Sequence, residues 1–189
     1  MSLLDLDSRW KRFNDTGRAC PCCGETFSGI FDLGYAHPSD WPHAGPDEGG
    51  EVVEGEDRLN ADLCRHAGRY FLRCVMMIPV QGSDEHFGFG LWAQVSEEVF
   101  RNYLGTYDDP PADFRGGNGL LANVLPGFTD EDMVPLVLAP VSGDEATRPL
   151  VMAEAGALHE AQTQGISFDR LLDIYAEAGR DIRPHLTQD

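Results

Sequence analysis

Hydrophobic and polar residues follow their most regular pattern in residues 70–96, which we predict to form a central β-hairpin. The first half, YFLRCVMMIPV, is apolar on both sides apart from Arg73, as expected of a strand that is covered on both faces. Residues 81–85 are polar and include Gly82, as in a hairpin loop. The second half places apolar side chains on one side at a period of two residues, namely Phe87, Phe89, Leu91, Ala93 and Val95.

Apolar residues at helical spacing predict helices near both ends of the chain and after the hairpin. Residues 3–13 fit a short amphipathic helix. Ser96 is a favourable N-cap for a helix whose apolar face runs from Val99 to Tyr107. Residues 157–164 fit another short helix, and Ser167 caps a last one that stops at Gly179.

Shorter apolar runs predict further strands at residues 28–35, 120–125, 134–141 and 149–153. Two prolines, Pro135 and Pro140, indicate that the run 134–141 is an edge strand or irregular. Residues 36–56 are rich in proline, glycine and acidic residues, and we expect them to form a mobile loop. The prediction is an α+β fold, with a mostly antiparallel sheet of about five or six strands, flanking helices and an N-terminal Cys knuckle.

The chain is predicted to be a single domain, 1–189, because its length and its 42% of hydrophobic residues suffice for one core. We expect the N-terminal helix within residues 1–17, the Cys knuckle and acidic loop within 18–66, the sheet and helices within 67–180, and a frayed tail at 181–189. No apolar run approaches the roughly 20 residues of a membrane helix, and the N-terminus lacks the apolar segment of a secretory signal. We therefore expect a cytoplasmic protein with reduced cysteines.

Acidic residues outnumber basic residues by 32 to 14, which gives a formal net charge of −18. Because this charge repels polyanions, nucleic acids and anionic membranes are not expected partners. The charge favours solubility, and it would also suit a basic protein as a partner.

Residues 20–24, Cys-Pro-Cys-Cys-Gly, fit the C-P-x-C-G turn that points two thiolates at one metal ion. Cys20 and Cys23 would be those two ligands, and Gly24 would relieve the strained backbone. A C-x-x-C pair can also serve redox chemistry, but such a pair should open a helix, and here a β-like stretch follows it. The cysteines could instead simply be reduced residues that pack in the core.

Further motifs follow the knuckle in a fixed order: Asp62-Leu63-Cys64, Phe71-Leu72-Arg73, Ile78-Pro79-Val80, residues 87–92, Leu125-Pro126-Gly127, Arg148-Pro149 and residues 162–166. In these motifs the chain resembles the bacterial domain of unknown function family 2199, from about Cys20 to Ala178. The resemblance implies a shared fold but no activity, since the family has none established. Members commonly carry histidines where this chain has Phe27 and near Gly156, so a site built on them would be lost or rebuilt here.

A structural zinc site needs four nitrogen or sulfur ligands in a tetrahedron. Cys64, which the resemblance retains, is the best third ligand after Cys20 and Cys23. For the fourth ligand we rank Cys74 first, then His66 and then Cys22. The predicted set is therefore Cys20, Cys23, Cys64 and Cys74.

Candidate catalytic residues are few, because the six histidines are scattered and no catalytic signature occurs. Arg73 within an apolar strand would either pair with a carboxylate such as Asp62 or bind a ligand anion. We expect a non-enzymatic, acidic binding protein with a structural zinc ion, for example an immunity-type inhibitor of a basic toxin. The alternative is an enzyme with a pocket between the sheet and residues 36–56, which would use Arg73 with His37 or His43.

Overall fold

The computed structural model describes residues 3–46, 50–142 and 147–187. Its helical elements are η1 (Leu3–Leu6), α1 (Ser8–Phe13), α2 (Glu97–Leu104), η2 (Gly105–Tyr107), α3 (Gly156–Gln164), α4 (Phe168–Glu177) and α5 (Arg183–Thr187). Its strands are β1 (Leu33–Gly34), β2 (Val52–Glu54), β3 (Asp57–Leu59), β4 (Leu63–His66), β5 (Arg69–Pro79), β6 (His86–Val95), β7 (Gly117–Leu121), β8 (Pro135–Leu138) and β9 (Val151–Ala153). Within these residues no helix is long and apolar enough to cross a membrane.

The strands of the described residues form one nine-stranded sheet, in which β2 to β9 pair in chain order. Every pair along this path is antiparallel, and β1 joins the sheet as a parallel neighbour of β6. The mixed α and β architecture and the antiparallel sheet agree with the prediction, but the predicted five or six strands are too few. The prediction missed β2, β3 and β4 because they are only three or four residues long and carry several charged residues.

The long hairpin of β5 and β6 is the centre of this sheet, as its alternating pattern predicts. Leu150, directly before β9, forms a parallel bridge with Val75 of β5, so the sheet curls back onto its own middle. Pro135 is the first residue of β8 and Pro140 lies beyond its end. The prolines indicated an edge or irregular strand at residues 134–141. β8 instead pairs on both sides, with β7 and with β9.

The two faces of the β5–β6 hairpin support two separate hydrophobic clusters. The larger one contains Cys74, Met76 and Ile78 of β5 and the residues that face them across β6. The smaller one lies on the opposite face and contains Trp41, Leu59, Cys64, Phe71 and Trp92. Because side chains along a strand alternate between the faces, Phe71 and Cys74 must point to different clusters.

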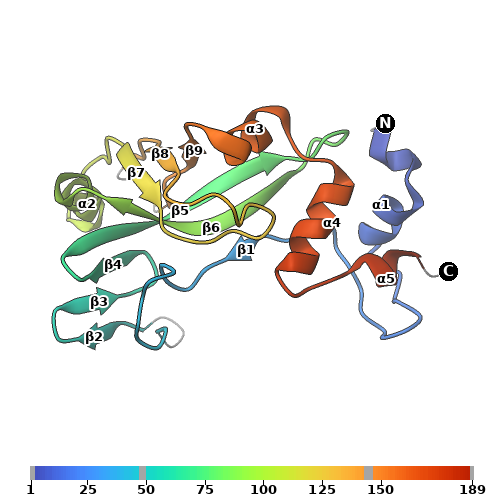
Figure 1. The fold of residues 1–189 in the computed structure, drawn as a ribbon, viewed down its shortest axis with the longest axis horizontal. Coiled ribbons are helices and arrows are strands. Elements are labelled where there is room, and N and C mark those ends of the chain that lie inside the picture. The colour runs from blue at the N-terminus through green and yellow to red at the C-terminus, as the bar shows by residue number, and fades with distance from the viewer. Residues whose placement is uncertain (1–2, 47–49, 143–146, 188–189) are drawn as a thin grey trace.

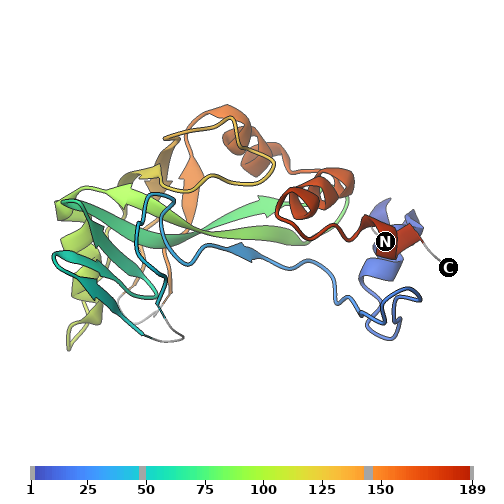
Figure 2. The same cartoon turned by 60° about the horizontal axis from the view of Figure 1, so that its bottom comes forward.

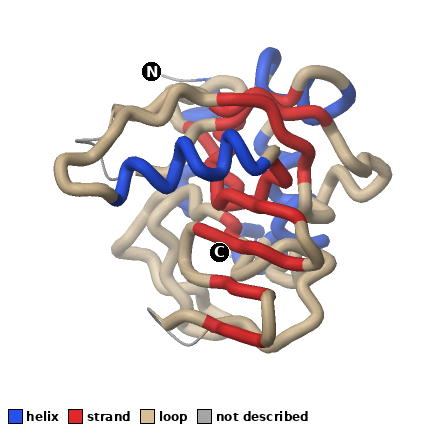
Figure 3. Tube along the Cα trace, turned by 90° about the vertical axis from the view of Figure 1, so that its left-hand side faces the viewer, coloured by secondary structure: helices blue, strands red, loops and turns tan. Residues whose placement is uncertain are grey.

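The molecule is elongated, and α1 and α5, near the two ends of the described chain, lie together at one end of the long axis (Figure 1). The short strands β2 to β4 lie at the other end, where Figure 3 shows them in a row beside a helix that corresponds to α2. Figure 2 confirms that α1 and α5 lie side by side, away from these strands. The sheet therefore separates the end of the molecule that carries α1 and α5 from the end that carries β2 to β4.

The helices α2 and α4 begin at the serine caps that the sequence predicts. The Ser96 hydroxyl accepts a hydrogen bond from the Val99 amide, and the Ser167 hydroxyl accepts one from the Arg170 amide. The predicted helix at 3–13 is instead divided, because Asp7 caps a new helix there by accepting from the Arg9 amide. The predicted apolar stripe is also incomplete: Trp10 and Phe13 are buried, but Leu6 is exposed.

A frayed tail was expected at 181–189, but residues 183–187 form α5, and residues 188–189 lie outside the described part of the chain. Ile182 and Leu186 are buried with the large cluster. The Arg12 guanidinium donates to the Leu186 carbonyl at 2.8 Å, and that of Arg18 donates to the His185 carbonyl at 3.2 Å. Apolar burial and these two hydrogen bonds together hold α5 against the N-terminal region.

Candidate metal centre

The Cys-Pro-Cys-Cys-Gly sequence forms a tight turn that gathers three thiols. The Cys20 amide donates to the Glu25 carbonyl at 2.7 Å, and the Gly24 amide donates to the Cys20 carbonyl at 2.8 Å. Gly24 has φ of 75°, a left-handed conformation that glycine adopts without strain. Ala19 and Thr26 form an antiparallel bridge on either side, so a hairpin-like turn, and not a helix start, carries the cysteines. This context does not favour a redox C-x-x-C pair.

The fourth group of the site comes from the other end of the sequence. His185 lies in α5, and its Nδ1 atom is 3.3 Å from Cys20 Sγ, 3.2 Å from Cys22 Sγ and 3.5 Å from Cys23 Sγ. An ion pair of 2.6 Å between Arg180 and Glu25 ties the segment before α5 to the same turn. The sequence did contain a signal for this helix, since Ile182 and Leu186 are spaced by one helical turn.

The arrangement can hold a metal ion, because one atom from each of Cys20, Cys22, Cys23 and His185 lies within 4.8 Å of the others. Cys20 Sγ and Cys22 Sγ are 3.0 Å apart. With usual zinc bond lengths, a tetrahedral site has sulfur atoms about 3.8 Å apart and sulfur and nitrogen about 3.6 Å apart. Since all the distances lie within 4.8 Å, changes of about 1 Å or less in each would bring the four atoms to that geometry.

The thiols of this turn differ in acidity. The hydrogen bond with Cys22 lowers the pKa of Cys20 to about 6. The same bond raises the pKa of Cys22 to about 11, because loss of its proton would place two negative sulfur atoms side by side. Cys20 is buried, whereas Cys22 and Cys23 are exposed. The cluster therefore lies at the surface, with one side accessible to an incoming ion.

The structure brings Cys20 and Cys23 together as predicted, but it places Cys64 and Cys74 elsewhere. Cys64 belongs to the small hydrophobic cluster and Cys74 to the large one, on opposite faces of the sheet. Burial raises the pKa of Cys64 to about 12 and that of Cys74 further still. Their places in the ligand set are taken by Cys22, which we ranked last, and by His185, which we did not consider.

His66, the alternative fourth ligand, lies at the end of β4 and contacts Asp57. The Asp57 carboxylate also contacts His43, and these two hydrogen bonds hold its pKa well below the usual range. The β4 end of the molecule is remote from α5 (Figure 1), so His66 cannot reach the thiol cluster.

Arg73 occupies the face of β5 that is opposite Cys74. Its expected partner, Asp62, instead accepts from Arg148 at 2.6 Å. Arg73 Nη1 has a weak contact of 3.4 Å with the Ala61 carbonyl, and Nε is buried without a hydrogen bond. Burial lowers the pKa of Arg73, and the nearby charge of Arg148 lowers it further.

The hollow between the sheet and the loop at residues 39–40 has a volume of about 220 Å³. The described residues that line it are Ser39, Asp40, Arg69, Phe71, Gln94, Leu121, Ala122, Asn123, Val124, Asp132 and Met133. Neither Arg73 nor the loop histidines His37 and His43 are among them. His37 Nδ1 instead lies 2.8 Å from the Pro38 carbonyl oxygen.

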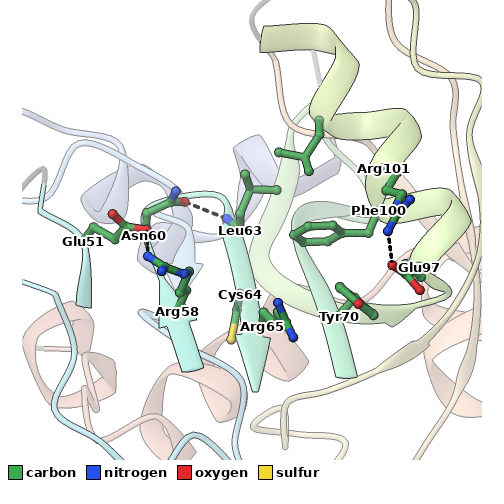
Figure 4. Close-up of a pocket in the computed structure, with 11 residues that line it drawn as sticks. Glu51, Arg58, Asn60, Leu63, Cys64, Arg65, Tyr70, Glu97, Phe100 and Arg101 are labelled. Carbon is green, nitrogen blue, oxygen red and sulfur yellow. Dashed lines mark hydrogen bonds and ion pairs between the residues drawn. The ribbon is translucent and has the colours of Figure 1, made fainter. Parts of the chain in front are cut away.

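A larger cleft of about 430 Å³ lies between α2 and the short strands. Its apolar lining comes from Leu63, Tyr70, Phe100 and Leu104, and Figure 4 shows Phe100 and Tyr70 on one side and Arg58 and Asn60 on the other. Charged residues at the cleft form two ion pairs, Arg58 with Glu51 and Arg101 with Glu97. This lining can contact a partner, but it gathers no acid and base around one reacting position.

Comparison with known proteins gives one match. A family model described as "Uncharacterized protein conserved in bacteria" (DUF2199) matches residues 19–166. No curated protein matches, and no solved structure matches. The matched residues include Cys20, Cys22 and Cys23, whereas His185 lies beyond them.

Proposed function

Because this chain belongs to the DUF2199 family of uncharacterized bacterial proteins, we propose its function from the site alone: it is a zinc-stabilised, non-enzymatic binding protein. The observation that carries this proposal is the convergence of Cys20, Cys22, Cys23 and His185. Three thiolates and one imidazole are a common ligand set of structural zinc sites. Phe27, a position at which we expected histidine in relatives, packs against the His185 ring with centroids 6.0 Å apart.

A structural role fits the ligand number and the position of the site. Catalytic zinc keeps a coordination position for water or substrate, whereas four protein ligands close the coordination sphere. The ion would link residues 20–23 to α5 and so fasten the two chain ends to each other. In the described structure those ends are also joined by arginine contacts, by the ion pair between Arg180 and Glu25, and by the burial of Ile182 and Leu186.

A binding role is supported by the net charge and by the cleft beside α2. The formal charge of −18 would attract a basic protein and accelerate its association at low salt. The cleft combines an apolar lining with paired charges, as interfaces do. The cleft itself is lined by three arginines and two glutamates, so the attraction would come from the acidic surface around it and the contact from its apolar residues. We therefore infer a basic protein as partner, with the apolar lining between α2 and β2 to β4 as the contact.

Metal analysis of protein purified without added zinc tests the first part of the proposal. We expect close to one zinc per chain, and X-ray absorption should show sulfur at about 2.3 Å and nitrogen at about 2.0 Å. His185→Ala and Cys22→Ser should lose zinc, whereas His86→Ala, at an exposed position in β6, should keep it. Less than a third of an equivalent in the wild type, or a shell without sulfur, would contradict the proposal.

Affinity capture from a bacterial lysate at low and high salt tests the second part. We expect a basic protein that is retained at low salt and released at high salt, because screening weakens charge attraction. Phe100→Ala should reduce retention if the cleft forms the contact, and Leu150→Ala, at an exposed position outside the cleft, is the control. A partner with no salt dependence, or equal capture by both variants, would contradict this part.

A further inference from the structure

A second group of metal-binding side chains lies at the opposite end of the molecule. One ligand atom from each of His43, Asp57 and His66 lies within 4.8 Å of the others. His43 Nε2 is 3.0 Å and His66 Nδ1 is 2.8 Å from the same oxygen, Asp57 Oδ2. We propose that these three residues bind a second divalent transition-metal ion, with at least one coordination position left open.

The backbone holds two of the three residues on paired strands. β3 and β4 are antiparallel, and Arg58 pairs with Arg65 and Leu59 with Cys64. Continuing this register by one residue places Asp57 directly opposite His66, on the same side of the sheet. The Ala67 amide donates to Asp57 Oδ1 at 3.1 Å, so the second carboxylate oxygen is already oriented. Supporting hydrogen bonds of this kind position the ligands of metal sites.

The third residue, His43, is positioned by the buried Trp41. The Trp41 ring packs edge-on against both imidazoles, with centroid distances of 4.9 Å to His43 and 5.7 Å to His66. Its Nε1 atom donates to the Ala44 carbonyl at 3.1 Å, which fixes the loop that carries His43. Trp41 itself is only 5% exposed, so the loop is anchored next to the site.

The distances and ligand types indicate the class of ion. Adjacent ligands of an octahedral ion with bonds of about 2.1 Å lie about 3.0 Å apart, close to both distances to Asp57 Oδ2. Two imidazoles and one carboxylate suit zinc and ferrous iron, which bind to such triads with open positions, rather than calcium or magnesium. The side chains of His43, Asp57 and His66 are 31%, 21% and 15% exposed, so water can reach the ion.

A simpler interpretation is that Asp57 only clamps the two histidines by hydrogen bonds. The two interpretations predict different effects of the variants Asp57→Asn and His66→Gln on metal affinity. Both variants retain polar groups that can hydrogen-bond, but the first removes a negative ligand and the second removes an imidazole. A clamp tolerates these changes with a modest loss of stability, whereas a metal site loses affinity.

The test uses full-length protein that already contains one equivalent of zinc, titrated with Co²⁺ by calorimetry and by tryptophan fluorescence. We expect one further equivalent to bind, with quenching of the nearby Trp41 and without the sulfur-to-cobalt absorption that thiolate ligands produce. Asp57→Asn and His66→Gln should each weaken this binding at least about tenfold, while His37→Gln should bind as the wild type does.

Zinc content and the unfolding temperature of each variant show whether it is folded. A folded wild type that binds no second equivalent, or a folded His66→Gln variant that binds it unchanged, would overturn the proposal. Loss of zinc from the thiol cluster would instead concern only the first site, because the two sites share no residue.

Discussion

The guanidinium of Arg73 is poorly hydrogen-bonded, although the charge of Asp62 partly offsets the cost of its burial. Its Nε atom is buried without a hydrogen bond, and Asp62 is paired with Arg148 instead. We predict that Arg73→Met leaves the free energy of unfolding unchanged or raises it by up to about 1 kcal/mol, because an unsatisfied buried group is removed. Chemical denaturation with urea measures this difference.

Arg148→Met is the matched control, since it removes the partly exposed arginine that does pair with Asp62. It should lower stability by no more than about 1 kcal/mol, because solvent screens such a pair. If Arg73→Met instead costs more than Arg148→Met, then the guanidinium of Arg73 has a stabilising partner and the structural account of this residue is wrong.

The cysteines show which parts of the candidate site could be predicted from individual residues. Cys20 and Cys23 were predictable because they are three residues apart, in a turn whose glycine has the required positive φ. Cys64 and Cys74 were plausible ligands only as long as the face of each strand was unknown. Cys64 is paired with Phe71 between β4 and β5, so the two side chains point to the same face of the sheet. Phe71 is three residues before Cys74, and because this spacing is odd, Cys74 points to the opposite face.

At the scale of elements, α5 contributes the ligand His185 although it lies outside the Cys knuckle at residues 20–24. We predict that Leu186→Ala weakens zinc binding although it removes no ligand, because the buried leucine holds α5 in place. A loss of about 2 kcal/mol in packing would reduce the fraction of docked α5, and the apparent zinc affinity, by up to about 30-fold. Competition with a chelator measures this affinity.

Leu104→Ala in α2 is the control for this prediction, since Leu104 is 39% exposed and lies at the cleft, far from α5 (Figure 1). It should leave zinc affinity unchanged. If Leu186→Ala also leaves it unchanged, the arginine contacts to the α5 carbonyls are sufficient to hold the helix.

Elements whose signals are local were predictable, and elements that depend on tertiary pairing were not. The serine caps of α2 and α4 and the alternation in β6 act within a few residues, and the structure contains all three. β2 to β4 have no such signal, because their strand conformation depends on pairing with one another and with β5. α5 has only five residues, too few for a stable isolated helix, and it is stabilised by tertiary packing.

For the molecule as a whole, the two candidate sites lie at opposite ends of one sheet (Figure 1). The sequence could not place them, since one joins residues 20–23 to residue 185 and the other joins residue 43 to residues 57 and 66. The sheet that separates them depends on the β5–β6 hairpin, which the sequence did predict. A change at one site should therefore leave the metal content of the other site intact.

The net charge affects the stability of the whole molecule. A formal charge of −18 on 189 residues means that the folded chain repels itself, and folding brings these charges closer together. We predict that raising NaCl from about 10 mM to about 150 mM increases the unfolding temperature, because the Debye length falls from about 30 Å to about 8 Å. A gain of about 1 kcal/mol would correspond to about 2–4 °C for a domain of this size.

Salt also screens the attraction within ion pairs. The sign of the change in unfolding temperature therefore shows whether surface repulsion or ion pairing dominates. The ion pairs of the described residues are mostly partly or fully exposed, as in Arg101 with Glu97, and each contributes little. Repulsion over the whole surface should therefore dominate. Sucrose at the same osmolality is the control for general solute effects, and a fall in the unfolding temperature with NaCl would show that specific ion pairs outweigh the net charge.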